Sequence, residues 1–356
     1  MNLLHLIDNF EKVNFGIWNA ALFNSTELVG LGYTSFILIP KKFSDFKYPA
    51  VANLVFEKKS EIIKILDSAN ISPENTIVIT HGCWQWPSNI GNKLKNKGFR
   101  WIATPHGMLE PWSLSQKKKR KKVFWNLLEK NRIQNADAIR AVGYPEYLNL
   151  KKKLNTKLQI EHISNCVDKV EIEAKNWDGP LQFLFMARIN EKKGVIPLAK
   201  AWLNSALNNS DKYELLFAGP DDGLLSDLTE TLEGSNNAKY IGSVYGEEKI
   251  ELLKKSHFYV LPSFSEGFPT SVLEAMNYGL IALISEGCNF PDVFEKNLAI
   301  KVSPEMEDIQ KGLSLVLMTT AKDLDQLSKA GHQYIKENYI TEVISQQLNQ
   351  FYCSKI

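Results

Sequence analysis

Short apolar segments alternate with segments of helical pattern along almost the whole chain, and this alternation restricts the fold more than any other feature. Apolar strands linked by helices are typical of parallel sheets with helices on both faces. With 356 residues, the chain is too long for one ordinary domain and long enough for two complete cores. The sequence therefore predicts an α/β protein with two doubly wound, Rossmann-like domains. The predicted strands are 3–7, 33–39, 76–80, 100–104, 136–142 and 159–163, then 181–187, 213–219, 240–242, 257–261, 280–284 and 299–302.

The domain boundary is predicted near the middle of the chain. Residues 169–180 are polar and end in Gly179-Pro180, a pair typical of turns and linkers. We therefore predict an N-terminal domain over 1–168, a linker over 169–180, and a second domain that begins at 181. One long helix is predicted over 17–29, and helices are predicted from about 305 to the C-terminus.

The composition excludes several other classes of protein. A hydrophobic content of 44% and a charged content of 23% indicate a globular chain. No apolar run approaches the ~20 residues of a membrane span. The first residues lack the basic and apolar regions of a secretory signal, so the expected location is the cytoplasm. The four cysteines are scattered without a C-x-x-C pair, which argues against disulfides and zinc; we expect no bound metal.

Charge is distributed unequally between the two halves of the chain. Residues 1–168 hold 24 Lys and Arg against 14 Asp and Glu, a net charge of +10, and the remainder holds 18 against 26, a net charge of −8. The first half could face an anionic partner. The alternative is that two solvated surfaces of opposite sign attract one another.

The stretch 261–276, Leu-Pro-Ser-Phe-Ser-Glu-Gly-Phe-Pro-Thr-Ser-Val-Leu-Glu-Ala-Met, is predicted to be a strand end, a loop and a helix start. Open α/β sheets bind ligands at this edge, and anions favour a helix N-terminus. Glu266 and Glu274 lie on either side of the loop. Because carboxylates would repel a phosphate, we expect them to accept hydrogen bonds from sugar hydroxyls. Alternatively, Ser271-Val-Leu-Glu274 forms a capping box and Glu274 only stabilises the helix.

The segment 266–276 resembles the E-x7-E signature of family 4 glycosyltransferases, which have the GT-B fold and retain the configuration of the transferred sugar. The resemblance extends over most of the chain. It implies that Glu274 holds the ribose of a nucleotide-sugar donor and Glu266 the sugar. It also implies that the second domain, 181–338, binds the donor, and that a final helix within 339–356 returns to the N-terminal, acceptor-side domain. The donor-binding residues implied for the loop are Glu266, Gly267, Phe268, Pro269, Thr270 and Glu274.

Two basic residues lie in the segment that follows the predicted strand 181–187. Arg188 and Lys193 lie five residues apart in a loop before a helix, where a guanidinium fork and a point charge suit an anion with several oxygens. The element resembles the R-x4-K-G motif of the same family, which implies that both side chains bind the donor pyrophosphate and act in catalysis. The resemblance also implies donor contacts at Ser243 and Val244, near the base, and at Gly16, the one glycine left of a usual pair.

Two predicted strands end in His-Gly, at His81 and His106. For either histidine alone, a packing role is the simpler interpretation. The segment Thr-Pro-His-Gly-Met-Leu-Glu-Pro-Trp around His106 resembles the family segment that lines the sugar site. The resemblance implies that His106 is the active-site histidine, and His81 is a candidate acceptor contact.

A run of six basic residues precedes an apolar segment in the first half of the chain. Three interpretations remain open: a solvated helix start, a contact with anionic lipid or a lipid pyrophosphate acceptor, and nucleic acid. No recognised nucleic-acid-binding module accompanies the run, so we expect no nucleic-acid partner. The residues are Lys117, Lys118, Lys119, Arg120, Lys121 and Lys122.

Together these features predict a glycosyltransferase of the EC 2.4 type that needs no cofactor. It would transfer a sugar from a UDP- or GDP-sugar to a glycan or lipid-linked acceptor in surface polysaccharide or lipopolysaccharide biosynthesis. If the basic run contacts lipid, it would act as a peripheral membrane protein at the inner face of the cytoplasmic membrane. The alternatives are another GT-B enzyme, such as a nucleotide-sugar epimerase, or a nucleotide-binding protein without turnover. Binding alone would not require both carboxylates. A dehydrogenase is disfavoured because no G-x-G-x-x-G follows a strand.

Overall fold

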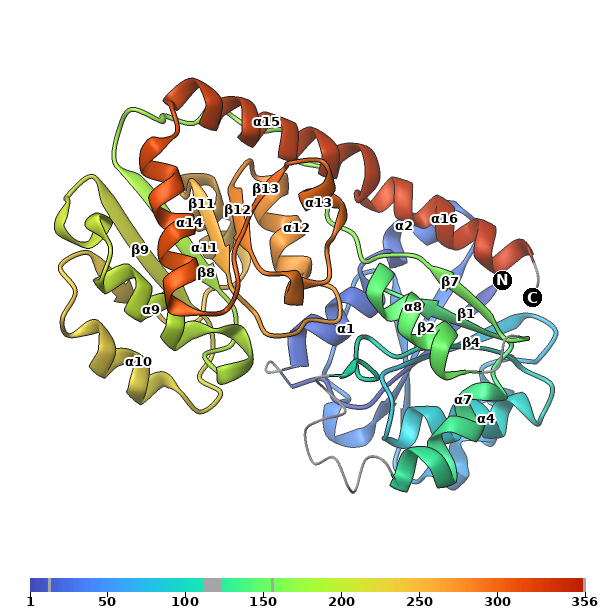
Figure 1. The fold of residues 1–356 in the computed structure, drawn as a ribbon. Helices are drawn as coiled ribbons and strands as arrows, with labels where there is room; N and C mark the ends of the chain where they lie inside the picture. The colour runs from blue at the N-terminus through green and yellow to red at the C-terminus, as the bar shows by residue number, and fades with distance from the viewer. Residues whose placement is uncertain (12–13, 112–122, 155–156, 355–356) are drawn as a thin grey trace. The chain divides into compact units, whose positions relative to one another are not determined.

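The computed structural model describes residues 1–11, 14–111, 123–154 and 157–354. The chain divides into two compact units, each an α/β structure with one parallel sheet (Figure 1). The first unit contains Met1–Cys166 and Thr341–Ile356, and the second contains Val167–Ile340. The segment 169–180, which the sequence suggests as a linker, falls within the second unit and has no helix or strand.

The sheet of the first unit has seven parallel strands in the order β3-β2-β1-β4-β5-β6-β7. All residues of β4 are buried, as expected of a central strand covered on both faces. The strand order reverses between β1 and β4, which is where ligands bind in folds of this type. The strands are β1 (Asn2–Ile7), β2 (Thr34–Pro40), β3 (Val51–Phe56), β4 (Thr76–His81), β5 (Arg100–Thr104), β6 (Ala138–Ala141) and β7 (Gln159–His162).

The helix predicted over 17–29 is wrong, because two short helices replace it. Asn24 lies at the break and is buried, and its side-chain amide donates to Ser345 Oγ at 2.8 Å. The strand β3 was not predicted at all, since its residues are mostly half-buried at the edge of the sheet. The helices of this unit include α1 (Phe15–Leu22), α2 (Ser25–Gly30), α3 (Ile62–Ser68), α4 (Trp86–Lys95), α7 (Lys130–Gln134), α8 (Tyr144–Lys153) and α16 (Thr341–Ser354), with a π-helix at Trp125–Glu129.

The C-terminal helix α16 belongs to the first unit although the second unit precedes it in the chain. Its buried residues Ile344, Leu348 and Phe351 share an apolar cluster with Leu3 of β1 and Leu28 of α2. The last helix therefore covers one face of the seven-stranded sheet.

The sheet of the second unit has six parallel strands in the order β10-β9-β8-β11-β12-β13. Its order reverses between β8 and β11, so the loops that follow these two strands meet at one edge. The strands are β8 (Leu181–Met186), β9 (Tyr213–Ala218), β10 (Ala238–Tyr240), β11 (Phe258–Leu261), β12 (Ile281–Ile284) and β13 (Ala299–Lys301). The helices are α9 (Val195–Leu203), α10 (Leu225–Leu232), α11 (Gly246–Lys255), α12 (Thr270–Asn277), α13 (Asp292–Glu295), α14 (Met306–Met318) and α15 (Ala321–Asn338).

Among the helices that the structure describes, none has both the length and the apolar character to cross a membrane.

Candidate active site

The loop after β8 and the loop after β11 are in backbone contact at the carboxyl edge of the second sheet. The N–H of Phe264 donates to the carbonyl of Lys192 at 2.8 Å. Gly194 has a φ of +67°, and a Cβ at this position would lie 2.2 Å from the carbonyl oxygen of Pro262. Only glycine permits this approach without strain. The glycine of the R-x4-K-G element therefore has a structural reason, which is to place Lys193 against the 262–266 loop.

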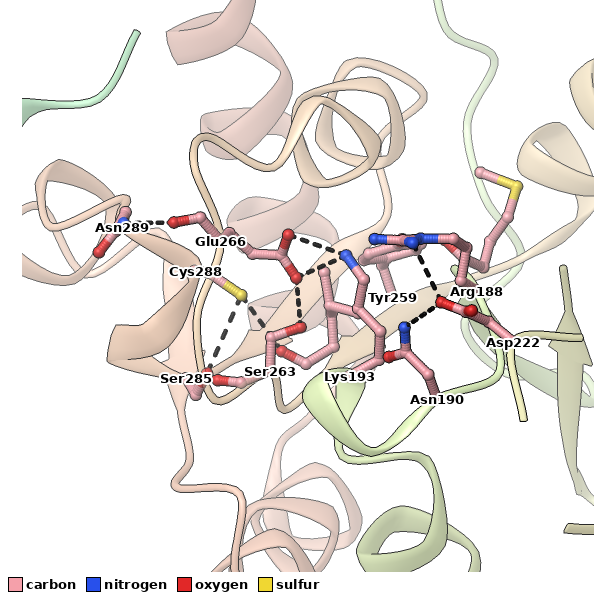
Figure 2. Close-up of polar contacts among 12 residues, drawn as sticks. Arg188, Asn190, Lys193, Asp222, Tyr259, Ser263, Glu266, Ser285, Cys288 and Asn289 are labelled. Atoms are coloured by element: carbon pink, nitrogen blue, oxygen red, sulfur yellow. Dashed lines mark hydrogen bonds and ion pairs between the residues drawn. The ribbon is translucent and has the colours of Figure 1, made fainter. Parts of the chain in front are cut away.

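Lys193 and Glu266 form a mostly buried ion pair across these two loops (Figure 2). The Lys193 ammonium donates to both carboxylate oxygens of Glu266, at 2.7 and 2.8 Å. The Ser263 hydroxyl donates to Oε1 of the same carboxylate at 2.6 Å. Burial alone would raise the pKa of Glu266, but the cations of Lys193 and Lys192 and these hydrogen bonds outweigh it and hold the pKa below its usual value. Glu266 is therefore ionised at neutral pH.

The Glu266 loop is also fixed from the side of β12. The N–H of Glu266 donates to the carbonyl of Gly287 at 2.6 Å, and Asn289 Nδ2 donates to the carbonyl of Glu266 at 2.6 Å. A Cβ at Gly287 would lie 2.2 Å from the carbonyl oxygen of Ser263. Because the loop is held on both sides, the Glu266 carboxylate is placed before any ligand binds.

Arg188 lies in the loop after β8 and forms a second, more exposed ion pair (Figure 2). Its Nη1 donates to Asp222 Oδ2 at 3.0 Å, and Asn190 Nδ2 donates to the same oxygen at 2.7 Å. Asp222 follows β9, and its own N–H donates to the carbonyl of Ile189 at 3.1 Å. The side chain of Arg188 is 41% exposed, so an anion can reach it from solvent.

Glu274 does not form the capping box that the sequence offers as an alternative. The N-cap of α12 is Pro269, which has no side chain able to cap, and no side-chain capping hydrogen bond is present there. Instead, Lys249 of α11 donates to Glu274 Oε1 at 2.7 Å. The pair is about four-fifths buried. Glu274 thus projects away from the backbone of its own helix and toward α11.

The remaining predicted donor residues lie in loops and helix starts of their own units. Gly267 and Phe268 donate no backbone hydrogen bond within the described part of the chain, although they immediately precede α12. Two open N–H groups at a helix start suit an anion. Pro269 is the N-cap of α12 and Thr270 its first residue, Ser243 and Val244 lie between β10 and α11, and Gly16 lies in the first turn of α1, in the other unit.

In the first unit, the two predicted histidines belong to a row of three. His81 Nδ1 lies 3.0 Å from His106 Nε2, and His81 Nε2 lies 3.0 Å from Nδ1 of His5 on β1. The neighbouring rings are stacked, with centroids 5.3 Å apart. His81 is buried and both its ring nitrogens are engaged. The acceptor contact predicted for His81 therefore does not fit this geometry, whereas His106 as a residue is only partly buried.

Sequence reasoning missed the partners of the predicted residues. In the second unit, Lys249 and Asp222 reach their partners through tertiary packing, as His5 does in the first unit. Ser263 lies within the 261–276 stretch, and Asp222 lies in a Pro-Asp-Asp-Gly turn that follows a strand at the same edge of the sheet, so these two had a signal in the sequence. The run Lys117 to Lys122 lies outside the described residues. Within the described ranges, no three His, Cys, Asp or Glu side chains are arranged to hold a metal ion.

The second unit is similar in sequence to a known family of proteins, and the whole chain is similar in structure to solved proteins. Residues 168–334, which include the E-x7-E and R-x4-K-G segments, match the family model described as Glycosyl transferases group 1, so the resemblance to group 1 glycosyltransferases is confirmed. HepE of Anabaena, solved in complex with UDP and glucose, is similar in structure over 99% of this chain and 100% of its own, with a TM-score of 0.76 and 13% identity. The sheet topology and this similarity confirm the predicted GT-B fold class.

Two curated relatives match over part of their length. The N,N'-diacetylbacillosaminyl-diphospho-undecaprenol alpha-1,3-N-acetylgalactosaminyltransferase of Campylobacter jejuni is 32% identical over 152 residues, which are 42% of this chain and 36% of the relative. O-antigen chain mannosyltransferase B of Escherichia coli is 24% identical over 166 residues, 45% of this chain and 43% of the relative. The matched regions thus span less than half the length of these relatives.

Proposed function

We propose that this chain is a retaining glycosyltransferase that transfers a sugar from a UDP- or GDP-sugar to a glycan or lipid-linked glycan in surface polysaccharide biosynthesis. The observation that carries the proposal is the fixed ion pair between Lys193 and Glu266, with Arg188 in the same loop as Lys193. This pair lies at the switch point of a sheet whose sequence matches group 1 glycosyltransferases. The names of the two curated relatives support an acceptor in surface glycan assembly.

The donor would bind at the carboxyl edge of the second sheet. Arg188 and Lys193 would bind the pyrophosphate, with the N–H groups of Gly267 and Phe268 at the start of α12. Glu266, ionised and already oriented, would accept hydrogen bonds from hydroxyls of the transferred sugar. Its pairing with Lys193 gives one carboxylate and one cation in contact, which matches a ligand whose sugar and diphosphate are adjacent.

The chemical step is loss of the nucleotide diphosphate from an oxocarbenium-like sugar. Negative charge grows on the leaving diphosphate, and fixed cationic donors stabilise that charge more in the transition state than in the ground state. Arg188 and Lys193 are in place to do this. We assign no nucleophile among the described side chains of the second unit. Instead, we propose that the acceptor hydroxyl attacks the sugar and that the donor phosphate accepts the proton of this hydroxyl. His106 would hydrogen-bond the sugar.

The Glu274→Gln variant should bind the donor about 10- to 100-fold more weakly, because a hydrogen bond from a ribose hydroxyl to a charged group contributes about 1.5–3 kcal/mol. Isothermal titration with the donor nucleotide measures this. The matched control is Lys249→Met, which breaks the same ion pair and keeps the carboxylate. Equal losses of affinity in the two variants would mean that Glu274 serves only to pair with Lys249.

We also propose that the chain acts at an anionic membrane surface on the cytoplasmic side. The support is local: Val123, Leu127 and Leu128 follow the basic run directly and are 58%, 68% and 44% exposed. Exposed apolar side chains beside a basic run suit insertion at a lipid headgroup boundary.

Neutralising Lys117, Lys118, Lys119, Arg120, Lys121 and Lys122 to glutamine should abolish sedimentation with vesicles that contain anionic lipid. Each basic residue near such a surface contributes about 1 kcal/mol. A variant with Lys151 and Lys152 replaced by glutamine, on the exposed end of α8, controls for the general loss of positive charge. Unchanged sedimentation of the sixfold variant would remove the membrane contact from the account.

A further inference from the structure

The row His5, His81 and His106 crosses the switch point of the first sheet, because His5 is on β1, His81 ends β4, and His106 follows β5. Side chains of polar residues rarely enter such a core without a partner. Here each contact is a hydrogen bond between ring nitrogens, at 3.0 Å in both cases. The row connects a fully buried ring to the half-buried ring of His106.

The three rings are neutral in the folded protein. Burial, with a smaller contribution from the nearby Arg140 cation, lowers the pKa of His5 and of His106 to about 3. Burial and the two neighbouring rings lower the pKa of His81 well below its usual value. Each neutral imidazole carries one N–H, so the row holds three ring protons.

Two of these protons are used by the two hydrogen bonds, and the third must lie at one end of the row. If it lies on His106 Nδ1, all three rings are Nδ1–H tautomers. If it lies on His5 Nε2, all three are Nε2–H tautomers. The two hydrogen bonds must point the same way, so the tautomer of one ring sets the tautomers of the others.

The surroundings favour the first arrangement. His5 Nε2 is buried and has no hydrogen-bond partner in the described part of the chain. A buried N–H without a partner is rare in folded proteins, and one at this position would cost about 1–3 kcal/mol. At the other end, His106 is partly buried, and in the described part of the chain its Nδ1 is not among the buried atoms that lack a partner, unlike His5 Nε2; a proton on His106 Nδ1 therefore carries no such cost.

The backbone at His106 is held in a strained conformation, which fixes the position of its side chain. His106 has a φ of +53°, which for a residue other than glycine costs about 1–3 kcal/mol. The buried Glu146 carboxylate keeps it there, since it accepts from the N–H of Gly107 at 2.5 Å and from the N–H of Val142 at 2.9 Å. Strain of this kind persists where surrounding contacts fix it, and it is common at functional sites.

We propose that His5 and His81 are positioning residues that hold His106 as the Nδ1–H tautomer, so that His106 presents a hydrogen-bond donor to an oxygen of the transferred sugar. His106 then cannot act as a general base through Nδ1. The hydrogen-bonded row and the tautomers of its three rings are inferred from the geometry alone. The contact with the sugar rests on the proposed glycosyltransferase function.

The first test is the tautomer itself, measured on the full chain labelled with ¹⁵N-histidine at neutral pH. Long-range ¹H–¹⁵N correlation spectra distinguish protonated from unprotonated ring nitrogens, and single His→Gln variants assign the signals. We expect all three rings to carry the proton on Nδ1. Three Nε2–H rings, or a mixture, would overturn the proposal. His162→Gln, in the same unit on β7, is the control that should leave the three signals unchanged.

The second test separates positioning from packing. His5→Leu should release the tautomer of His106 and lower kcat about 10- to 100-fold, the size of effect seen when the orienting partner of a metal-ligating histidine is removed, with little change in the donor KM. His5→Asn keeps an N–H near the position of Nδ1, so its His106 tautomer and its kcat should both equal those of the parent chain. An unchanged His106 tautomer in His5→Leu would exclude the positioning role. Because the spectra need no substrate, they test the tautomers of the three histidines even if no transfer activity is found.

Discussion

The Arg188→Ala variant should transfer sugar about 100- to 1,000-fold more slowly than the parent chain, which is the usual effect of removing one donor that stabilises transition-state charge. The reason is the proposed role of Arg188, which would supply a guanidinium fork to the leaving diphosphate. The measurement is kcat from initial rates at saturating donor. The stability of the fold should hardly change, since Arg188 and Asp222 are 41% and 38% exposed and pairs of this kind contribute about 0–1 kcal/mol.

Lys239→Ala is the matched control for this experiment. Lys239 pairs with Glu214 at 2.7 Å in the same unit and is 62% exposed, but it lies on the edge strand β10, outside the predicted donor residues. We expect its kcat to equal that of the parent chain. An Arg188→Ala variant as active as Lys239→Ala would exclude a role of Arg188 in the transfer step.

The Lys193→Met variant should lose both activity and stability. It would remove the second proposed pyrophosphate contact, and it leaves the Glu266 carboxylate buried without its cation. Breaking a buried pair in this way costs about 3–5 kcal/mol in the free energy of unfolding, measured by denaturant titration of the full chain. Lys193 and Glu266 are 13% and 10% exposed, so solvent can compensate little of this cost.

A double variant separates the two effects. Lys193→Met combined with Glu266→Gln removes the uncompensated charge, and most of the lost stability should return, while transfer activity should stay absent. Recovery of activity in the double variant would show that Lys193 matters only as the partner of Glu266. A single variant as stable as the parent would show that the pair is not buried in solution.

The strands could be predicted more reliably than the helices because a strand buried on both faces is apolar throughout. β5 has the predicted bounds of 100–104, and its last four residues are buried. β3 escaped prediction because it is an edge strand with mostly half-buried residues. The break between α1 and α2 depends on Asn24, whose partners Cys166 and Ser345 are far away in the sequence.

The same distinction applies to the candidate site. Arg188, Lys193 and Glu266 each lie in a short motif next to a strand end, so their positions follow from the strand order. The partners do not: Lys249 reaches Glu274 from another helix, and His5 lies 76 residues from His81 in the sequence. A pairing across that distance depends on the register of β1 against β4. The capping box, the local alternative for Glu274, is absent because α12 begins at Thr270 with Pro269 as its N-cap, so Ser271 lies inside the helix.

The measurement that tests the account most directly is isothermal titration of the parent chain and Arg188→Ala against a panel of UDP- and GDP-sugars and free nucleotides, in EDTA. The account predicts selective binding of one donor by the parent chain and its loss in the variant. No binding by the parent chain across the panel, or equal binding by both proteins, would contradict a donor site built around Arg188.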